Sequence, residues 1–104
     1  MIDTPALLRH VVLFAFTDDA GGRIDAIVDA FGALPAAIPA IATYEWGTNV
    51  SPEGLNDGFT HCFTLTFVTE QDRDAYLVHP AHQAFVATLD GALARSLVLD
   101  YWTP

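Results

Sequence analysis

The segment Leu8-Arg9-His10-Val11-Val12-Leu13-Phe14-Ala15-Phe16 consists almost entirely of apolar residues, many of them β-branched or aromatic. Such residues are typical of β-strands, so we predict a strand here. Because side chains alternate between the two faces of a strand, His10, Val12, Phe14 and Phe16 lie on one face and Val11, Leu13 and Ala15 on the other. Both faces are mainly apolar, so we expect both to be covered.

The residues after this strand predict a mixture of helices and strands. A turn is expected at 17–22, and apolar residues then recur at helical spacing over 23–34, where Pro35 and Pro39 are expected to end the helix. Further strands are expected at 43–50, 59–68 and 96–102, and further helices at 70–76 and 80–93, the former capped by Thr69. The order strand, helix, strand, strand, helix, strand predicts an α+β fold with helices on one face of a four-stranded, mainly antiparallel sheet.

The second face of this sheet predicts a partner. In the last strand, Leu97 and Leu99 lie on the face opposite Val98 and Asp100. Helices can cover one face of the sheet, and the other would leave a large apolar patch of the kind that normally marks an interface. We therefore predict a homodimer that packs sheet against sheet. The alternative is a monomer with a partly apolar open face.

Size and composition narrow the classes of function. The 104 residues fit one domain, and the formal net charge is −9 with four arginines and no lysine. Those arginines are scattered, so we expect no nucleic-acid partner. No apolar run reaches the ~18 residues of a membrane span, and no basic segment precedes an apolar core at the start. We therefore expect a cytoplasmic protein that does not enter membranes.

Cofactors and metals are not expected either. Cys62 is the only cysteine, which excludes an internal disulfide and a cysteine-based zinc site. The sequence shows no nicotinamide, flavin or phosphate-binding motif. His10 and His61 are expected on the same sheet face, on adjacent parallel strands, where their rings would be neighbours. They could bind each other, a ligand or a metal, but no third ligand is evident from spacing, so we predict no metal site.

The segment Tyr76-Leu77-Val78-His79-Pro80-Ala81-His82-Gln83-Ala84-Phe85 indicates acid–base chemistry. Pro80 suits the first turn of a helix, which places His82 in that turn. A buried histidine stays neutral and can remove a proton from carbon next to a carbonyl, and a tyrosine hydroxyl can stabilise the resulting enolate. Such a pair typically contributes ~10²–10⁴-fold in rate. The alternative is a core histidine whose ring nitrogens bond to the backbone. His79 is expected to be mostly structural, as a cap of the helix.

Three segments together carry a family resemblance: His10–Phe14, Asn49–His61 and Tyr76–Phe85. From about His10 to Trp102 the chain resembles the stress-responsive α/β-barrel (Dabb) domain family. The resemblance implies a single domain, 1–104 with a core of about 8–102, with a ferredoxin-like βαββαβ fold that dimerises through its sheets into a barrel. Some plant relatives are polyketide cyclases that use no cofactor.

Carried over to this sequence, the cyclase pattern implies three catalytic residues. His82 would be the general base, Tyr76 its partner or oxyanion donor, and His10 a polar wall. The implied ligand pocket between helices and sheet would be lined by Val12, Phe14, Val28, Phe31, His61, Phe63, Phe85, Leu93 and Val98.

The resulting expectation is a dimer that binds a small aromatic or polyketide-like molecule in an apolar pocket, with cofactor-free cyclase or lyase activity. One alternative is a non-enzymatic stress-associated structural dimer. Another is a cofactor-free monooxygenase, which rests on fold analogy alone.

Overall fold

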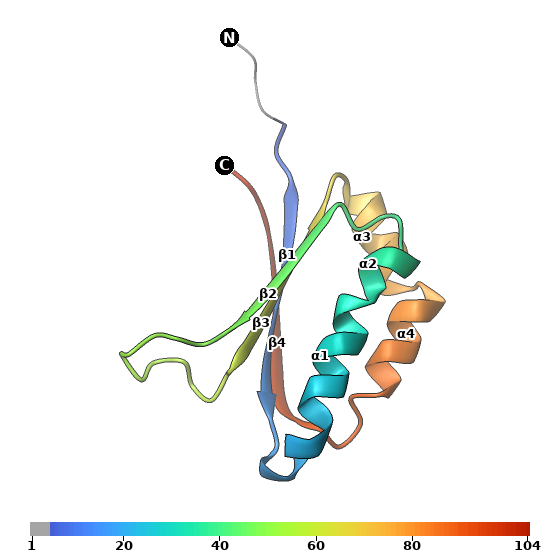
Figure 1. Ribbon diagram of the computed structural model, residues 1–104. Helices are drawn as coiled ribbons and strands as arrows, with labels where there is room; N and C mark the ends of the chain where they lie inside the picture. The colour runs from blue at the N-terminus through green and yellow to red at the C-terminus, as the bar shows by residue number, and fades with distance from the viewer. Residues whose placement is uncertain (1–4) are drawn as a thin grey trace.

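Four antiparallel strands form one sheet, and the helices cover one of its faces (Figure 1). The computed structural model describes residues 5–104. The strands follow the spatial order β2-β3-β1-β4, with the bounds β1 Leu8–Phe16, β2 Thr43–Thr48, β3 His61–Phe67 and β4 Leu93–Trp102. This order places β1 and β3 in the middle of the sheet and leaves β4 as an edge strand. The predicted α+β fold is confirmed.

The helices lie in two groups after β1 and after β3. The first group contains a 3₁₀ helix and two α-helices, namely η1 Asp18–Arg23, α1 Ile24–Gly32 and α2 Leu34–Ala37. The second contains α3 Glu70–Leu77 and α4 Pro80–Ala87. In the described part of the chain, no helix is long and apolar enough to cross a membrane.

The register of the central strand decides which side chains meet the helices. His10 lies opposite Leu65 of β3 and Asp100 of β4, and Phe14 lies opposite His61 and Ser96. Because strand side chains alternate, this pairing turns His10 and Phe14 toward the helices and the odd-numbered residues of β1 away from them. The core under the helices contains Leu8, Val12, Phe14, Ile27, Val28, Phe31, Leu34, Ile38, Phe63, Leu65, Phe67, Tyr76 and Phe85.

One polar atom in this core lacks a partner. The ring of Tyr44 packs 5.7 Å from that of Phe31, measured between centroids. The Tyr44 hydroxyl is buried and makes no hydrogen bond to any of residues 5–104. Burial raises the pKa of Tyr44 to about 12, so the phenol stays protonated and keeps an unsatisfied donor.

Several boundaries differ from the sequence predictions, including strand ends, which shift by two or three residues at β2, β3 and β4. The expected turn at 17–22 falls largely in η1, and Pro35 does not end a helix but occupies the first turn of α2, where its missing N–H is not needed. The last helix ends at Ala87, well before the expected residue 93. Gly91, with φ of +75°, allows the chain to turn there, so Leu93 opens β4 and pairs with Phe16.

The face of the sheet away from the helices stays open in the single chain. Leu97, Leu99 and Tyr101 are exposed on it. Residues 49–60, which we call the arm, connect β2 to β3 and project on this open side (Figure 1). A salt bridge between Arg95 and Asp57 ties the arm to β4. An apolar face of this kind is what a sheet-to-sheet dimer would cover.

Candidate functional site

A cavity of about 270 Å³ lies between the sheet and the second helix group. Strands β1 and β4 form one side of the cavity, α3 and α4 form the other, and Phe31 of α1 also lines it. Three of its lining residues, Leu77, Val86 and Val98, are apolar and partly exposed, so the cavity opens to solvent past apolar side chains. The complete lining is His10, Val12, Phe14, Phe31, Tyr76, Leu77, His82, Phe85, Val86, Leu89, Leu93, Ser96 and Val98.

Two helix caps place the polar end of this cavity. The Thr69 side chain accepts a hydrogen bond from the Asp72 backbone N–H and so starts α3, whose last turn contains Tyr76. The Nδ1 atom of His79 accepts one from the Ala81 N–H and so starts α4, with Pro80 as its first residue. His82 then lies in the first turn of α4. The rings of Tyr76 and His82 are 4.3 Å apart between centroids.

The hydrogen bonding of His82 defines which ring nitrogen is free. Its Nδ1 lies 3.0 Å from the carbonyl oxygen of Leu77. A carbonyl can only accept, so Nδ1 carries the proton and donates it. In the neutral ring, Nε2 therefore keeps its lone pair, as a general base requires.

Burial shifts the pKa values of both His82 and Tyr76. It lowers the pKa of His82, against a smaller opposing effect of the Leu77 hydrogen bond and with some help from nearby His10. Tyr76 is only 1% exposed, and this burial raises its pKa well above the ordinary value. At neutral pH the site thus presents a neutral imidazole beside a protonated phenol, which is one acceptor and one donor.

His10 is held by two residues that were not singled out as site residues. Its Nδ1 is 2.7 Å from Oδ1 of Asp100, and the guanidinium of Arg73 lies 2.9 Å from the other oxygen, Oδ2. The His10 ring lies 5.7 Å from that of Tyr76, edge to face. Alternation along the last strand already placed Asp100 on the face of Val98, and an acidic residue on an apolar face was the available signal. The role of Arg73 could not be read from sequence because it depends on a contact 27 residues away.

The other predicted lining residues are divided between cavity and core. Val12, Phe14, Phe31, Phe85, Leu93 and Val98 line the cavity, as expected. Val28 and Phe63 lie in the packed core instead, because the ring of Phe31 stacks on Phe63 and separates it from the space. Sequence reasoning did not include Leu77, Val86, Leu89 and Ser96, although helical spacing from His82 would have suggested Val86 and Leu89.

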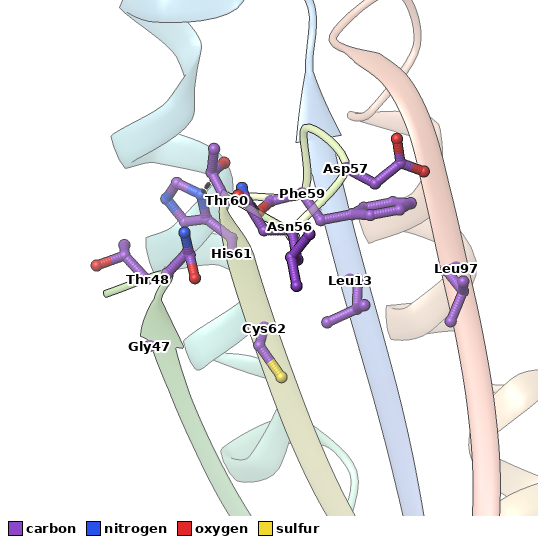
Figure 2. A pocket seen from close by; sticks show the side chains of 12 residues that line it. Leu13, Gly47, Thr48, Asn56, Asp57, Phe59, Thr60, His61, Cys62 and Leu97 are labelled. Atoms are coloured by element: carbon purple, nitrogen blue, oxygen red, sulfur yellow. Dashed lines mark hydrogen bonds between the residues drawn. The ribbon is translucent and has the colours of Figure 1, made fainter. Parts of the chain in front are cut away.

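His61 lies outside this cavity, although its ring packs on the predicted helix-facing side of the sheet, 5.1 Å from the ring of Phe16 between centroids. It lines a larger hollow, of about 520 Å³, that is formed by the arm and the open side of the sheet (Figure 2). Its Nδ1 bonds to the Thr60 hydroxyl at 2.8 Å, and its ring stacks on Trp46. The smaller cavity is the better candidate site, because it alone of the two contains the Tyr76, His82 and His10 side chains.

The expectation that His10 and His61 are neighbours is wrong. Their strands are adjacent but antiparallel, and His61 pairs with Phe14, four positions along β1 from His10. The helices that connect β1 to β2 allow these two strands to run parallel, and β3 returns directly from β2 to lie between them, antiparallel to both. Within residues 5–104, no three His, Cys, Asp or Glu side chains are grouped to hold a metal ion.

Comparison with known proteins assigns the fold to a family. The model of the stress responsive A/B barrel domain matches residues 8–103. The chain belongs to the stress-responsive A/B barrel (Dabb) family. It is 34% identical to the stress-response A/B barrel domain-containing protein HS1 of Arabidopsis thaliana, over 90% of this chain and 87% of that protein. It is 25% identical to olivetolic acid cyclase of Cannabis sativa, over 90% and 94% of the two chains.

The solved structures that resemble this chain include an enzyme and a dimeric protein. The hydroxynitrile lyase of Passiflora edulis superposes with a TM-score of 0.89 at 28% identity, covering 97% of this chain and 96% of that one. A dimeric ferredoxin-like protein of Bacteroides fragilis gives a TM-score of 0.79 at 26% identity, covering 93% and 96%. The ferredoxin-like fold predicted from the sequence is thus confirmed, and relatives within this fold include a cyclase and a lyase.

Proposed function

We propose that this protein is a dimeric, cofactor-free acid–base enzyme that acts on a small and mostly apolar hydroxynitrile or carbonyl compound. The observation that carries the proposal is the bond from His82 Nδ1 to the Leu77 carbonyl, which leaves Nε2 as the free nitrogen of a neutral ring. That ring lies beside the Tyr76 phenol at the wall of an apolar cavity. A base, a hydroxyl donor and water-poor surroundings are what proton abstraction needs.

The same two side chains, His82 and Tyr76, suit both reaction types suggested by the relatives. With a hydroxynitrile, His82 takes the hydroxyl proton, the bond to the nitrile carbon breaks, a carbonyl forms, and the imidazolium returns the proton to the departing cyanide. With a β-dicarbonyl substrate, His82 takes a proton from carbon and the electron pair moves to oxygen as an enolate. In either case the Tyr76 hydroxyl stabilises the charge that develops on oxygen.

The size of the cavity favours the smaller substrate. Its volume of about 270 Å³ lies at the lower end of ordinary ligand pockets. At ~30 Å³ of liquid per water molecule, it accommodates roughly nine waters, or a molecule with about as many heavy atoms. A one-ring hydroxynitrile fits this space better than a long polyketide chain does, so we favour lyase-type cleavage.

The proposal is tested with mandelonitrile as the substrate and benzaldehyde absorbance as the readout. We expect turnover by the wild type and a loss of ~10²–10⁴-fold in kcat for His82→Gln, because the variant lacks the base. Tyr76→Phe should lose ~10²-fold or more, because one donor to the developing charge is removed. His61→Gln is the matched control, since this histidine lies outside the cavity, and it should stay within twofold.

Two results would contradict the proposal. One is wild-type protein that neither cleaves mandelonitrile nor accelerates hydrogen exchange at the carbon of a small β-diketone. The other is His82→Gln with wild-type turnover. Urea unfolding of each variant separates a lost base from a lost fold.

A structural role is the second candidate, and one observation favours it. His79 and His82 each satisfy a backbone group, one as the cap of α4 and the other as a donor to Leu77. If these bonds are the whole purpose of the two histidines, His82→Ala lowers the free energy of unfolding and leaves turnover unchanged. Each lost bond of this kind costs about 1 kcal/mol.

A further inference from the structure

The two carboxylate oxygens of Asp100 bind different partners, one at the cavity wall and one near the surface. Oδ1 accepts the Nδ1–H of His10 at 2.7 Å, and Oδ2 accepts a guanidinium N–H of Arg73 at 2.9 Å. His10 is 4% exposed, whereas the side chains of Asp100 and Arg73 are 25% and 23% exposed. The three side chains therefore form a chain of charge-assisted hydrogen bonds that begins near solvent and ends at the cavity wall.

Arg73 joins two elements that both contribute to the cavity. It lies on α3, one helical turn before Tyr76, while Asp100 lies on the edge strand β4. The guanidinium also contacts Asp74, its neighbour in sequence. The contact with Asp100 thus connects the helix that carries the phenol to the strand that faces His10.

Geometry indicates why the second oxygen of Asp100 matters. A carboxylate on an edge strand that is one-quarter exposed can rotate toward water and leave its buried partner. Because Arg73 holds Oδ2, such rotation would break a second charge-assisted bond, so Oδ1 stays with His10. A histidine that donates from Nδ1 to a carboxylate is fixed in one tautomer and one orientation, with Nε2 as its free nitrogen.

We propose that Arg73 is a positioning residue of the cavity, which acts through Asp100 to hold His10 as an Nδ1–H tautomer whose Nε2 accepts a hydrogen bond from a polar group of the substrate. The substrate half of this inference rests on the proposed function. The half that concerns the tautomer and orientation of His10 does not, so the two can fail separately.

The first test uses nuclear magnetic resonance of the ¹⁵N-labelled protein without any ligand. In the wild type we expect a slowly exchanging, low-field Nδ1–H proton for His10, because the ring is buried and bonded to a carboxylate. Arg73→Gln should shift and broaden that resonance and mix the two ring tautomers, and Arg73→Lys should restore much of it. Arg95→Gln is the matched control, since it removes an arginine–aspartate salt bridge far from His10 and should change nothing.

The outcomes separate the possibilities. An unchanged His10 resonance in Arg73→Gln, or an equal change in Arg95→Gln, overturns the inference, whatever the turnover. If Arg73→Gln also disturbs folding in urea, Arg73→Lys and Asp74→Asn give the decision, because each keeps a cation next to Asp100. For the inference to survive, Asp74→Asn must retain the wild-type resonance and Arg73→Lys must retain much of it.

A kinetic test follows where turnover of mandelonitrile is found. Positioning of a hydrogen-bond acceptor predicts that Arg73→Gln raises KM several-fold while kcat falls less, with Arg73→Lys intermediate. Equal KM in the wild type and Arg73→Gln would overturn the substrate half. A protein without turnover would leave the resonance test intact and would count against the proposed function alone.

Discussion

Replacement of Phe31 by alanine should be among the most destabilising single changes in this protein. The ring is 2% exposed and stacks on Phe63 with 4.3 Å between centroids, while Phe85 lies 4.8 Å away and Phe14 6.1 Å away. Deletion of a buried phenylalanine ring costs roughly 3–5 kcal/mol. With three aromatic partners lost together, we expect about 4 kcal/mol.

Urea unfolding at fixed protein concentration measures this cost. With m of about 1–2 kcal/mol/M, the midpoint should fall by ~2–4 M. Because Phe31 also lines the cavity, the variant should accept larger ligands than the wild type does. Val78→Ala, on an exposed side chain at the end of α3, should change stability by less than about 0.5 kcal/mol. A loss below about 2 kcal/mol for Phe31→Ala would refute the reasoning, since it would mean that the surrounding rings collapse into the space.

Three further predictions follow from other parts of the structure. Burial lowers the pKa of His82, so kcat/KM, which reports the free protein, should rise with pH through a midpoint below the ordinary histidine value of about 6.5. In the same window stability should fall as pH drops, because the unfolded chain takes up a proton that the folded one resists, and a His82→Gln protein with an equally steep fall would contradict this. Tyr44→Phe removes a buried hydroxyl that has no partner, so the free energy of unfolding should rise by about 1 kcal/mol, and a loss in calorimetry would show that the hydroxyl is satisfied in solution. In the proposed sheet-paired dimer, Leu99→Asp places a charge on the buried apolar face and should give monomer in sedimentation experiments, whereas a dimer that persists in the variant would place the interface elsewhere.

The sequence predicted the fold well because its signals are local. The apolar, β-branched and aromatic residues of β1 indicated a strand, and the Thr69 and His79–Pro80 caps indicated two helix starts. The end of the last helix was misjudged, because α4 ends at Ala87 and the chain turns through 88–92, where Gly91 has a positive φ, before β4 begins.

Only part of the candidate site could be predicted, because its other contacts join residues far apart in the sequence. Tyr76 and His82 are six residues apart, so helix starts alone could bring them together. The bond of Asp100 to His10 joins residues 90 apart, and the alternation that placed Asp100 on the helix side gave no sign of its partner. Whether His10 and His61 meet depended on strand direction, which composition does not encode.

The cavity and the apolar sheet face lie on opposite sides of the same layer. Thirteen residues line the cavity on the helix side. In a dimer that pairs the open sheet faces and leaves the helix sides apart, each copy would keep its own His82 and Tyr76. Mixed dimers of one wild-type copy and one His82→Gln copy should work at half the rate, and substitutions that reshape one pocket should leave the companion pocket untouched.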